Sequence, residues 1–315
     1  MAKRRNSGRR NSGRRNKGRD VHGIVLLDKP QGLSSNQALQ RVKRIFNANK
    51  AGHTGSLDPL ATGMLPICLG EATKISGYLL DADKRYNAVC QLGVRTDSAD
   101  SEGEVIARKP VEGIKASDIK AVLQKFTGEI QQIPPMFSAL KRDGVPLYKL
   151  ARQGIEVERQ PRDITIYALD LINFDGDSLE FNIHCSKGTY VRTVVDDIGE
   201  ALGCGAHLTA LRRLQVDPFS GTELVTLDQL NTLQEQGVTE LDATLIPIEA
   251  GLANWTVVTL SAESESYIRQ GQSVFMPQIE SHALVRMHNE SGLFVGIGIV
   301  DEEGRLLPKR LMNLA

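Results

Sequence analysis

The sequence predicts an α+β protein with a mixed β-sheet, followed by a smaller β-rich module. Strand-like alternation and helical i, i+3, i+4 patterns follow one another without a strict β-α-β rhythm over roughly residues 23–213. After about residue 250 the pattern changes to short strand-like runs separated by turns. A chain of 315 residues with 41% hydrophobic and 24% charged side chains has ordinary globular composition, and this length more often forms two domains than one.

The first elements are a strand and a helix. The apolar run at residues 23–27 predicts a buried strand, and the segment DKPQG (28–32) supplies a turn. Ser34 or Ser35 can cap a helix that runs through Asn47, because its apolar residues fall on one face. Residues 52–70 are rich in Gly, Pro and Thr, which is typical of a loop.

The middle of the chain contains two further strands and two helices. Residues 86–92 and 179–185 alternate apolar and polar side chains, as strands do. The spacing of Ile119, Val122, Leu123 and Phe126 predicts a helix. The segment KGT (187–189) turns the chain into another helix, and Gly203 ends it.

The C-terminal module is expected to contain one short helix and three strands. The helix is predicted near residues 262–269. The strands are predicted near residues 283–288, 293–300 and 305–312, separated by the turn-rich segments NESG and DEEG.

The N-terminus is strongly basic although the whole chain has no net charge. Residues 1–19 hold nine of the 38 Lys and Arg and no acid, so the remaining chain carries 29 basic against 38 acidic side chains. The repeat RRNSG-RRNSG-RRN (4–15) contains no apolar residue, which predicts a disordered tail over residues 1–20. Such a tail can bind RNA phosphates through counterion release, or it can serve only as a solubilising segment.

Other features exclude several protein classes. No apolar run approaches the roughly 18 to 20 residues of a membrane helix, and no signal-peptide pattern follows the basic N-terminus. The four cysteines (Cys68, Cys90, Cys185 and Cys204) form no CxxC pair. This spacing favours buried free thiols in a reducing cytoplasm over a zinc ribbon or a disulfide framework.

The densest chemical signal is the segment GHTGSLDPLATG (52–63). Pro59 disfavours the α region for Asp58, and glycines on both sides permit positive φ or close backbone approach. A fixed carboxylate between Leu57 and Leu60 can act as a nucleophile or a base. Taken alone, however, an Asp-Pro pair is often only a turn.

The longer blocks around this segment resemble the TruB family of bacterial tRNA pseudouridine-55 synthases. The resemblance is carried by LLDKPQGLSSNQAL (26–39), GHTGSLDPLATGMLPICLGEATK (52–74), DKRY (83–86) and CSKGTYVRTVVDDIGEALGCGAHLTALRR (185–213). It implies a mixed-sheet pseudouridine synthase catalytic domain at 21–248 and a PUA-like RNA-binding domain at 249–315. Ser56 departs from the more usual alanine, and both residues are small.

The resemblance also implies roles for individual residues. Asp58 matches the catalytic aspartate, Tyr86 the tyrosine that packs on the target base, and Arg192 the arginine that pairs with the aspartate. His53, Tyr190 and Leu211 match substrate-binding residues. Lys29 and Pro30 match a motif that supports the site.

The implied reaction explains these residue types. Breaking an N–C glycosidic bond and rejoining the base through carbon oxidises nothing and transfers no outside group, so no cofactor and no metal is expected. The sequence leaves open whether Asp58 acts on the sugar carbon, the base carbon or a sugar proton. Arg192 is expected to keep Asp58 ionised, and Tyr86 is the candidate base for the C5 proton. Flipping the base costs a few kcal/mol, which stacking on tyrosine can offset at roughly 1 to 3 kcal/mol per base.

Three functions remain open from the sequence. The first is a stand-alone, monomeric, cytoplasmic isomerase that acts on the T-arm of tRNA. The second is an RNA-binding or RNA-folding protein with an inactive pocket, against which the intact Asp58, Tyr86 and Arg192 argue. The third is a guide-RNA-dependent synthase with partner proteins, which activity of the purified chain on a bare stem-loop would exclude.

Overall fold

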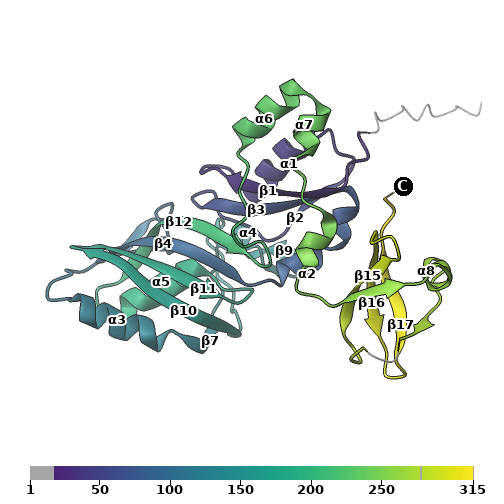
Figure 1. The fold of residues 1–315 in the computed structure, drawn as a ribbon. Coiled ribbons are helices and arrows are strands. Elements are labelled where there is room, and N and C mark those ends of the chain that lie inside the picture. The colour runs from purple at the N-terminus through teal and green to yellow at the C-terminus, as the bar shows by residue number, and fades with distance from the viewer. Residues whose placement is uncertain (1–17, 277–278, 315) are drawn as a thin grey trace, which may run out of the picture.

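The computed structural model describes residues 18–276 and 279–314, and it contains two main sheets (Figure 1). The larger sheet has eight strands in the order β1-β3-β12-β4-β11-β10-β7, with β2 also paired to β3. Its strands are β1 (Gly23–Lys29), β2 (Ala51–His53), β3 (Thr62–Leu69), β4 (Lys84–Leu92), β7 (Gly128–Gln132), β10 (Arg162–Asp175), β11 (Ser178–Cys185) and β12 (Ala206–Val216). The sheet is mixed as predicted, because β12 runs parallel to β3 and antiparallel to β4.

Helices cover the sheet in two groups (Figure 1). Near β1 and β3 lie α1 (Ser35–Ile45), α6 (Leu227–Gln236) and α7 (Val238–Asp242), and near β4 and β10 lie α3 (Ala116–Lys125) and α5 (Val191–Ala201). The remaining short elements are η1 (Gly70–Lys74), α2 (Ser76–Leu80), β5 (Val94–Thr96), β6 (Val105–Arg108), β8 (Lys141–Arg142), β9 (Val145–Pro146), α4 (Leu147–Ala151) and η2 (Ile248–Leu252). Each group of helices buries its apolar face against the sheet and so forms its own part of the core.

The predicted helix after the first strand is confirmed, with its start fixed by a local motif. Ser34 Oγ accepts a hydrogen bond from the backbone N–H of Gln37, and the Gln37 side chain accepts one from the backbone of Ser34. This capping box satisfies two donors that a helix start otherwise leaves unpaired. The helix ends at Ile45, two residues before the predicted end, because Asn47 adopts a φ of 47°.

The predicted loop at residues 52–70 is confirmed only for residues 54–61, because β2 and β3 occupy most of the rest. All but the first residue of β3 are buried, between the helices on one face and η2 with the C-terminal sheet on the other. A strand buried on both faces shows no alternation of apolar and polar side chains. Without that signal, the Thr, Gly and Pro residues of β3 predicted a loop instead. Asp28 and Lys29 likewise belong to β1 rather than to the following turn. The strands β7, β10 and β12 were not predicted.

The C-terminal part forms a five-stranded sheet, β13-β15-β16-β17-β14, with its own buried apolar cluster. Its elements are β13 (Val257–Leu260), α8 (Ala262–Arg269), β14 (Val274–Phe275), β15 (Leu284–Asn289), β16 (Phe294–Val300) and β17 (Arg305–Leu311). The predicted helix and three strands are therefore confirmed. This sheet packs beside η1, where Lys74 Nζ donates to the carbonyl of Leu311 at 2.7 Å.

The basic tail lies mostly outside the described residues. The prediction of disorder is wrong at its end, however, because Arg19 is fixed to the folded part. Its backbone N–H donates to Asn47 O at 2.6 Å, and its guanidinium pairs with Asp242. All four cysteines are buried and free, as predicted. Within residues 18–276 and 279–314, no helix is long and apolar enough to cross a membrane.

Candidate active site

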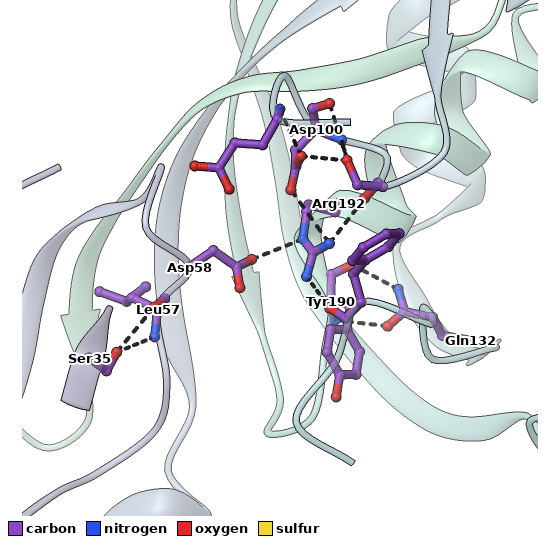
Figure 2. A network of polar contacts seen from close by, with 10 residues as sticks. Ser35, Leu57, Asp58, Asp100, Gln132, Tyr190 and Arg192 are labelled. Atoms are coloured by element: carbon purple, nitrogen blue, oxygen red, sulfur yellow. Dashed lines mark hydrogen bonds and ion pairs between the residues drawn. The ribbon is translucent and has the colours of Figure 1, made fainter. Parts of the chain in front are cut away.

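Asp58 lies on the loop between β2 and β3, and the start of α1 fixes the backbone around it. The buried Ser35 hydroxyl accepts a hydrogen bond from Leu57 N–H at 2.7 Å and donates one to Leu57 O at 3.1 Å (Figure 2). On the other side, Gly32 N–H donates to Pro59 O at 2.7 Å. The residues before and after Asp58 are therefore both held, which limits the directions its carboxylate can take.

Arg192, in the first turn of α5, connects Asp58 to two other segments. Its Nε lies 2.9 Å from Asp58 Oδ2, and its terminal nitrogens donate to Ser98 O at 3.0 Å and to Phe137 O at 2.7 Å (Figure 2). The Arg192 side chain is only 5% exposed, whereas that of Asp58 is 42% exposed. The guanidinium is thus a buried anchor, and the carboxylate it holds remains accessible.

A second carboxylate, Asp100, faces the same guanidinium. Its Oδ2 lies 3.5 Å from Arg192 Nη1, while its Oδ1 accepts hydrogen bonds from Ser98 Oγ at 2.6 Å and Glu102 N–H at 3.0 Å. Asp100 is 4% exposed. Asp100 could not be singled out from the sequence, because the segment TDSADSE (96–102) has the composition of an ordinary turn.

The ionisation of Asp58 depends on opposing effects. Burial raises the pKa of the Asp58 carboxyl above its ordinary value, and the negative charge of Asp100 acts in the same direction. The charge and hydrogen bond of Arg192 lower this pKa, as does the charge of Lys29. The expected effect of Arg192 is present, but burial outweighs it, so the net pKa shift is upward.

Tyr190 lies beside Arg192, and its backbone is held by a side chain that the sequence analysis also missed. Gln132 Oε1 accepts from Tyr190 N–H at 2.8 Å, and Gln132 Nε2 donates to Tyr190 O at 3.1 Å (Figure 2). Burial raises the pKa of the Tyr190 phenol, and the positive charges of Arg162 and Arg192 lower it. The two hydrogen bonds from Gln132 hold the backbone at the start of α5, and they thereby help to position Arg192 in its first turn.

Tyr86 and Leu211 lie on the neighbouring strands β4 and β12. Both are 8% exposed, and both belong to the apolar cluster that contains Leu57 and Leu60. Burial raises the pKa of the Tyr86 phenol, and the charge and hydrogen bonding of Arg213 lower it. Arg213 is a third residue that the sequence analysis did not single out.

His53 and Lys29 are the remaining predicted residues with titratable groups. Burial lowers the pKa of His53, whose Nδ1 is buried with no hydrogen-bond partner among the described residues. The fully buried Lys29 Nζ donates to Pro30 O at 2.9 Å and Leu33 O at 2.6 Å, and burial lowers its pKa to about 8. These bonds close the turn that leads to Ser35, so Lys29 and Pro30 contribute to the shape of the site.

Among the described residues, one group outside this network brings three side chains close together that are of the types that bind metals. Asp83, His184 and Asp217 each offer a ligand atom within 4.8 Å of the others. In the β4–β11 pairing His184 lies opposite Arg85, one residue along from Tyr86 and its partner Ile183. Successive strand residues face opposite sides of a sheet, so His184 and Tyr86 are on different faces. The group therefore cannot take part in chemistry at Asp58.

The comparisons with known proteins identify the family. The TruB family pseudouridylate synthase N-terminal domain matches residues 43–191, and the tRNA pseudouridylate synthase B C-terminal domain matches residues 192–253. The tRNA pseudouridine synthase B of Stutzerimonas stutzeri is 54% identical over 295 residues, which is 93% of this chain and 96% of that protein. The chain belongs to the TruB family. A third TruB domain, described as C-terminal, matches residues 256–312.

A second TruB relative agrees with this identification, and two solved structures share the fold. The tRNA pseudouridine synthase B of Cronobacter sakazakii is 53% identical over 301 residues, covering 93% of this chain and 96% of the relative. A Cbf5–Nop10–Gar1 complex contains a chain that is 27% identical, with a TM-score of 0.71 and coverage of 92% and 84%. A chain of the archaeal box H/ACA Nop10–Cbf5 complex shares the fold, with a TM-score of 0.70, 24% identity and coverage of 93% and 86%.

Proposed function

We propose that this TruB family member converts uridine 55 in the T-loop of tRNA to pseudouridine as a stand-alone isomerase. The observation that carries the proposal is the partly exposed Asp58 carboxylate held 2.9 Å from a buried arginine beside Tyr190. The similarity to proteins named tRNA pseudouridine synthase B supports tRNA as the substrate.

In this proposal each site residue has one role. Asp58 acts on the target nucleoside as an ionised carboxylate, and Arg192 keeps its pKa lower than burial alone would set it. Tyr86 packs on the uracil and takes the C5 proton after the new C–C bond has formed. Tyr190 and Leu211 contact the base. These residues hold, stack on and deprotonate the substrate, so the proposed reaction uses no cofactor and no metal.

Base flipping sets the energetic requirement. Extruding a nucleotide costs a few kcal/mol, and each base–aromatic stack returns roughly 1 to 3 kcal/mol. Tyr86 and Tyr190, helped by His53 inserted into the loop of the RNA, provide enough stacking to balance that cost. A neutral His53, which its lowered pKa favours, can enter among bases without carrying a charge into them.

The net affinity then comes from phosphate contacts. On β17 of the C-terminal sheet, Arg305, Lys309 and Arg310 are exposed. We assign this sheet, within residues 249–315, to a PUA-like RNA-binding domain, and residues 21–248 to the catalytic domain. The basic tail at residues 1–20 adds non-specific attraction to RNA.

Two properties distinguish the proposed enzyme from the chains in the H/ACA complexes. It needs neither a guide RNA nor a partner protein, and it acts as a monomer in the cytoplasm. The relatives at 53–54% identity are named tRNA pseudouridine synthase B, and they match this chain more closely than the H/ACA chains at 24–27% do.

The test uses the purified full chain and a bare T-arm stem-loop RNA. Pseudouridine has the same mass as uridine, so the product is located by carbodiimide labelling and primer extension. The proposal predicts a single labelled position at nucleotide 55. Binding without label would support an inactive RNA-binding protein, and activity only after adding a guide RNA would support the guide-dependent alternative.

A further inference from the structure

Four strands of the large sheet place a row of residues side by side next to Asp58. The registers pair Lys29 with Gly63, Gly63 with Arg213 and Arg213 with Tyr86. Gly63 has a φ of 97°, and a Cβ there would lie 2.2 Å from Arg213 O, so only glycine fits this position. The pairing of β12 with β4 also shifts register just after Arg213. Such a bulge redirects a side chain, and bulges are common next to active sites.

Arg213 is a buried cation with no acidic partner among residues 18–276 and 279–314. It is 1% exposed, and its Nε donates to Met64 O at 2.7 Å while a terminal nitrogen reaches Gly55 O at 3.5 Å. Its neighbour Arg212, in contrast, forms two hydrogen bonds to the Asp28 carboxylate at 2.8 and 3.0 Å. A buried unpaired charge costs several kcal/mol, so Arg213 needs negative charge nearby.

In the part of the chain that the structure describes, no carboxylate forms an ion pair with Arg213, and its titratable neighbours include other basic groups. The two nearby lysines, Lys29 and Lys84, are buried, and burial together with the charge of Arg213 lowers each pKa to about 8. Burial and the charge of Arg213 also lower the pKa of His53. The side chain that faces Arg213 in the β12–β4 register is the phenol of its cross-strand partner, Tyr86.

We propose that Arg213 is a positioning residue that orients the Tyr86 hydroxyl and stabilises its phenolate form in the last step of the reaction. This rests on the proposed function. The register puts the two side chains on the same face of adjacent strands. The Tyr86 phenol is otherwise buried among apolar residues, where a phenolate is unfavourable without a cation beside it.

The step balances in atoms and charge. Once uracil carbon C5 has bonded to the ribose C1′, C5 carries both that bond and its original hydrogen. The Tyr86 phenolate oxygen takes this hydrogen as a proton, and the C–H electron pair returns to the ring as a double bond. Nitrogen N1, which has lost its bond to the sugar, takes a proton from water. The hydroxide that remains takes the proton from the Tyr86 phenol and so regenerates the phenolate. Nothing is oxidised or reduced, and Arg213 is unchanged.

The experiment measures the hydrogen isotope effect at C5 in the full chain. The T-arm stem-loop is prepared with either hydrogen or deuterium at C5 of the target uridine, and single-turnover rates are compared. Arg213→Met removes the charge, Arg213→Lys retains one, and Arg212→Met is the matched control. Arg213→Met is expected to lower the rate about 100-fold, within the range of a positioned acid or base, and to enlarge the isotope effect. Arg213→Lys recovers part of the rate, and Arg212→Met keeps the original isotope effect.

A second variant separates the electrostatic role from a packing role. Replacing Tyr86 by 3,5-difluorotyrosine gives a more acidic phenol, which is expected to restore rate to Arg213→Met, or to Arg213→Lys if the methionine variant does not fold. No restoration in the folded variant, or a lower rate with an unchanged isotope effect, overturns the role of Arg213. If the unchanged chain makes no pseudouridine, the proposed function itself fails, and the two failures are thus distinguishable.

Discussion

Replacing Arg192 by methionine tests how the site keeps Asp58 ionised. At 2.9 Å the ion pair is worth about 6 kcal/mol with an effective dielectric constant of 20. The Asp58 side chain is 42% exposed, so solvent screening reduces this interaction energy to about 1 to 4 kcal/mol. That energy corresponds to a shift of about 1 to 3 units in the pKa of Asp58. Burial already raises the pKa of Asp58, and loss of Arg192 raises it further.

The direction in which the pH dependence of the rate moves follows from the need for an ionised Asp58. A carboxylate that must be ionised loses activity as the pH falls through its pKa. In Arg192→Met the acid limb of the single-turnover rate on the T-arm stem-loop should therefore move to higher pH by about 1 to 3 units. Circular dichroism at each pH serves as the folding control. A uniform loss of rate with the acid limb unmoved would refute this electrostatic role for Arg192.

Three further predictions concern stability and substrate binding. Gly63→Ala should lower the free energy of unfolding in urea by about 2 to 4 kcal/mol, because its Cβ would clash with Arg213 O; an unchanged midpoint would contradict the close approach. Gln132→Met removes both hydrogen bonds to the Tyr190 backbone, and is expected to raise KM more than it lowers kcat; an unchanged KM would leave Gln132 with a packing role. Lys29 has a pKa of about 8 in the folded chain and 10.5 as its reference, so the unfolded chain binds more protons between these pH values and stability rises with pH there. Lys29→Met should abolish this rise of about 3 kcal/mol in urea unfolding from pH 8 to 10.5, and a slope equal to that of the unchanged chain would contradict the depressed pKa.

The predictable parts of the fold are those whose signal is local. The helix α1 follows from Ser34, Gln37 and an apolar face, all within a few residues of one another. The strand β11 follows from its alternation, because one of its faces is only partly buried. The strand β3 failed for the opposite reason, since both its faces are packed and no alternation remains.

The residues of the site likewise fall into those with a local sequence signal and those that depend on distant contacts. Asp58 sits in a distinctive local segment, and the motif around Arg192 is equally recognisable; the structure brings the two into contact. Asp100 and Gln132 act through contacts with Arg192 and Tyr190, from turns and strand ends that are more than fifty residues away along the chain. Arg213 differs from Arg212 only in burial and strand register, and neither is visible before the sheet is assembled.

The central claim is that the Asp58 carboxylate performs the chemistry. Asp58→Asn keeps the size of the side chain and removes its negative charge. The most direct measurement is single-turnover pseudouridine formation by Asp58→Asn on the T-arm stem-loop, with RNA affinity measured in parallel. We expect no product and an unchanged dissociation constant for the RNA, whereas product formed at a rate comparable to that of the unchanged chain would contradict a catalytic role for Asp58.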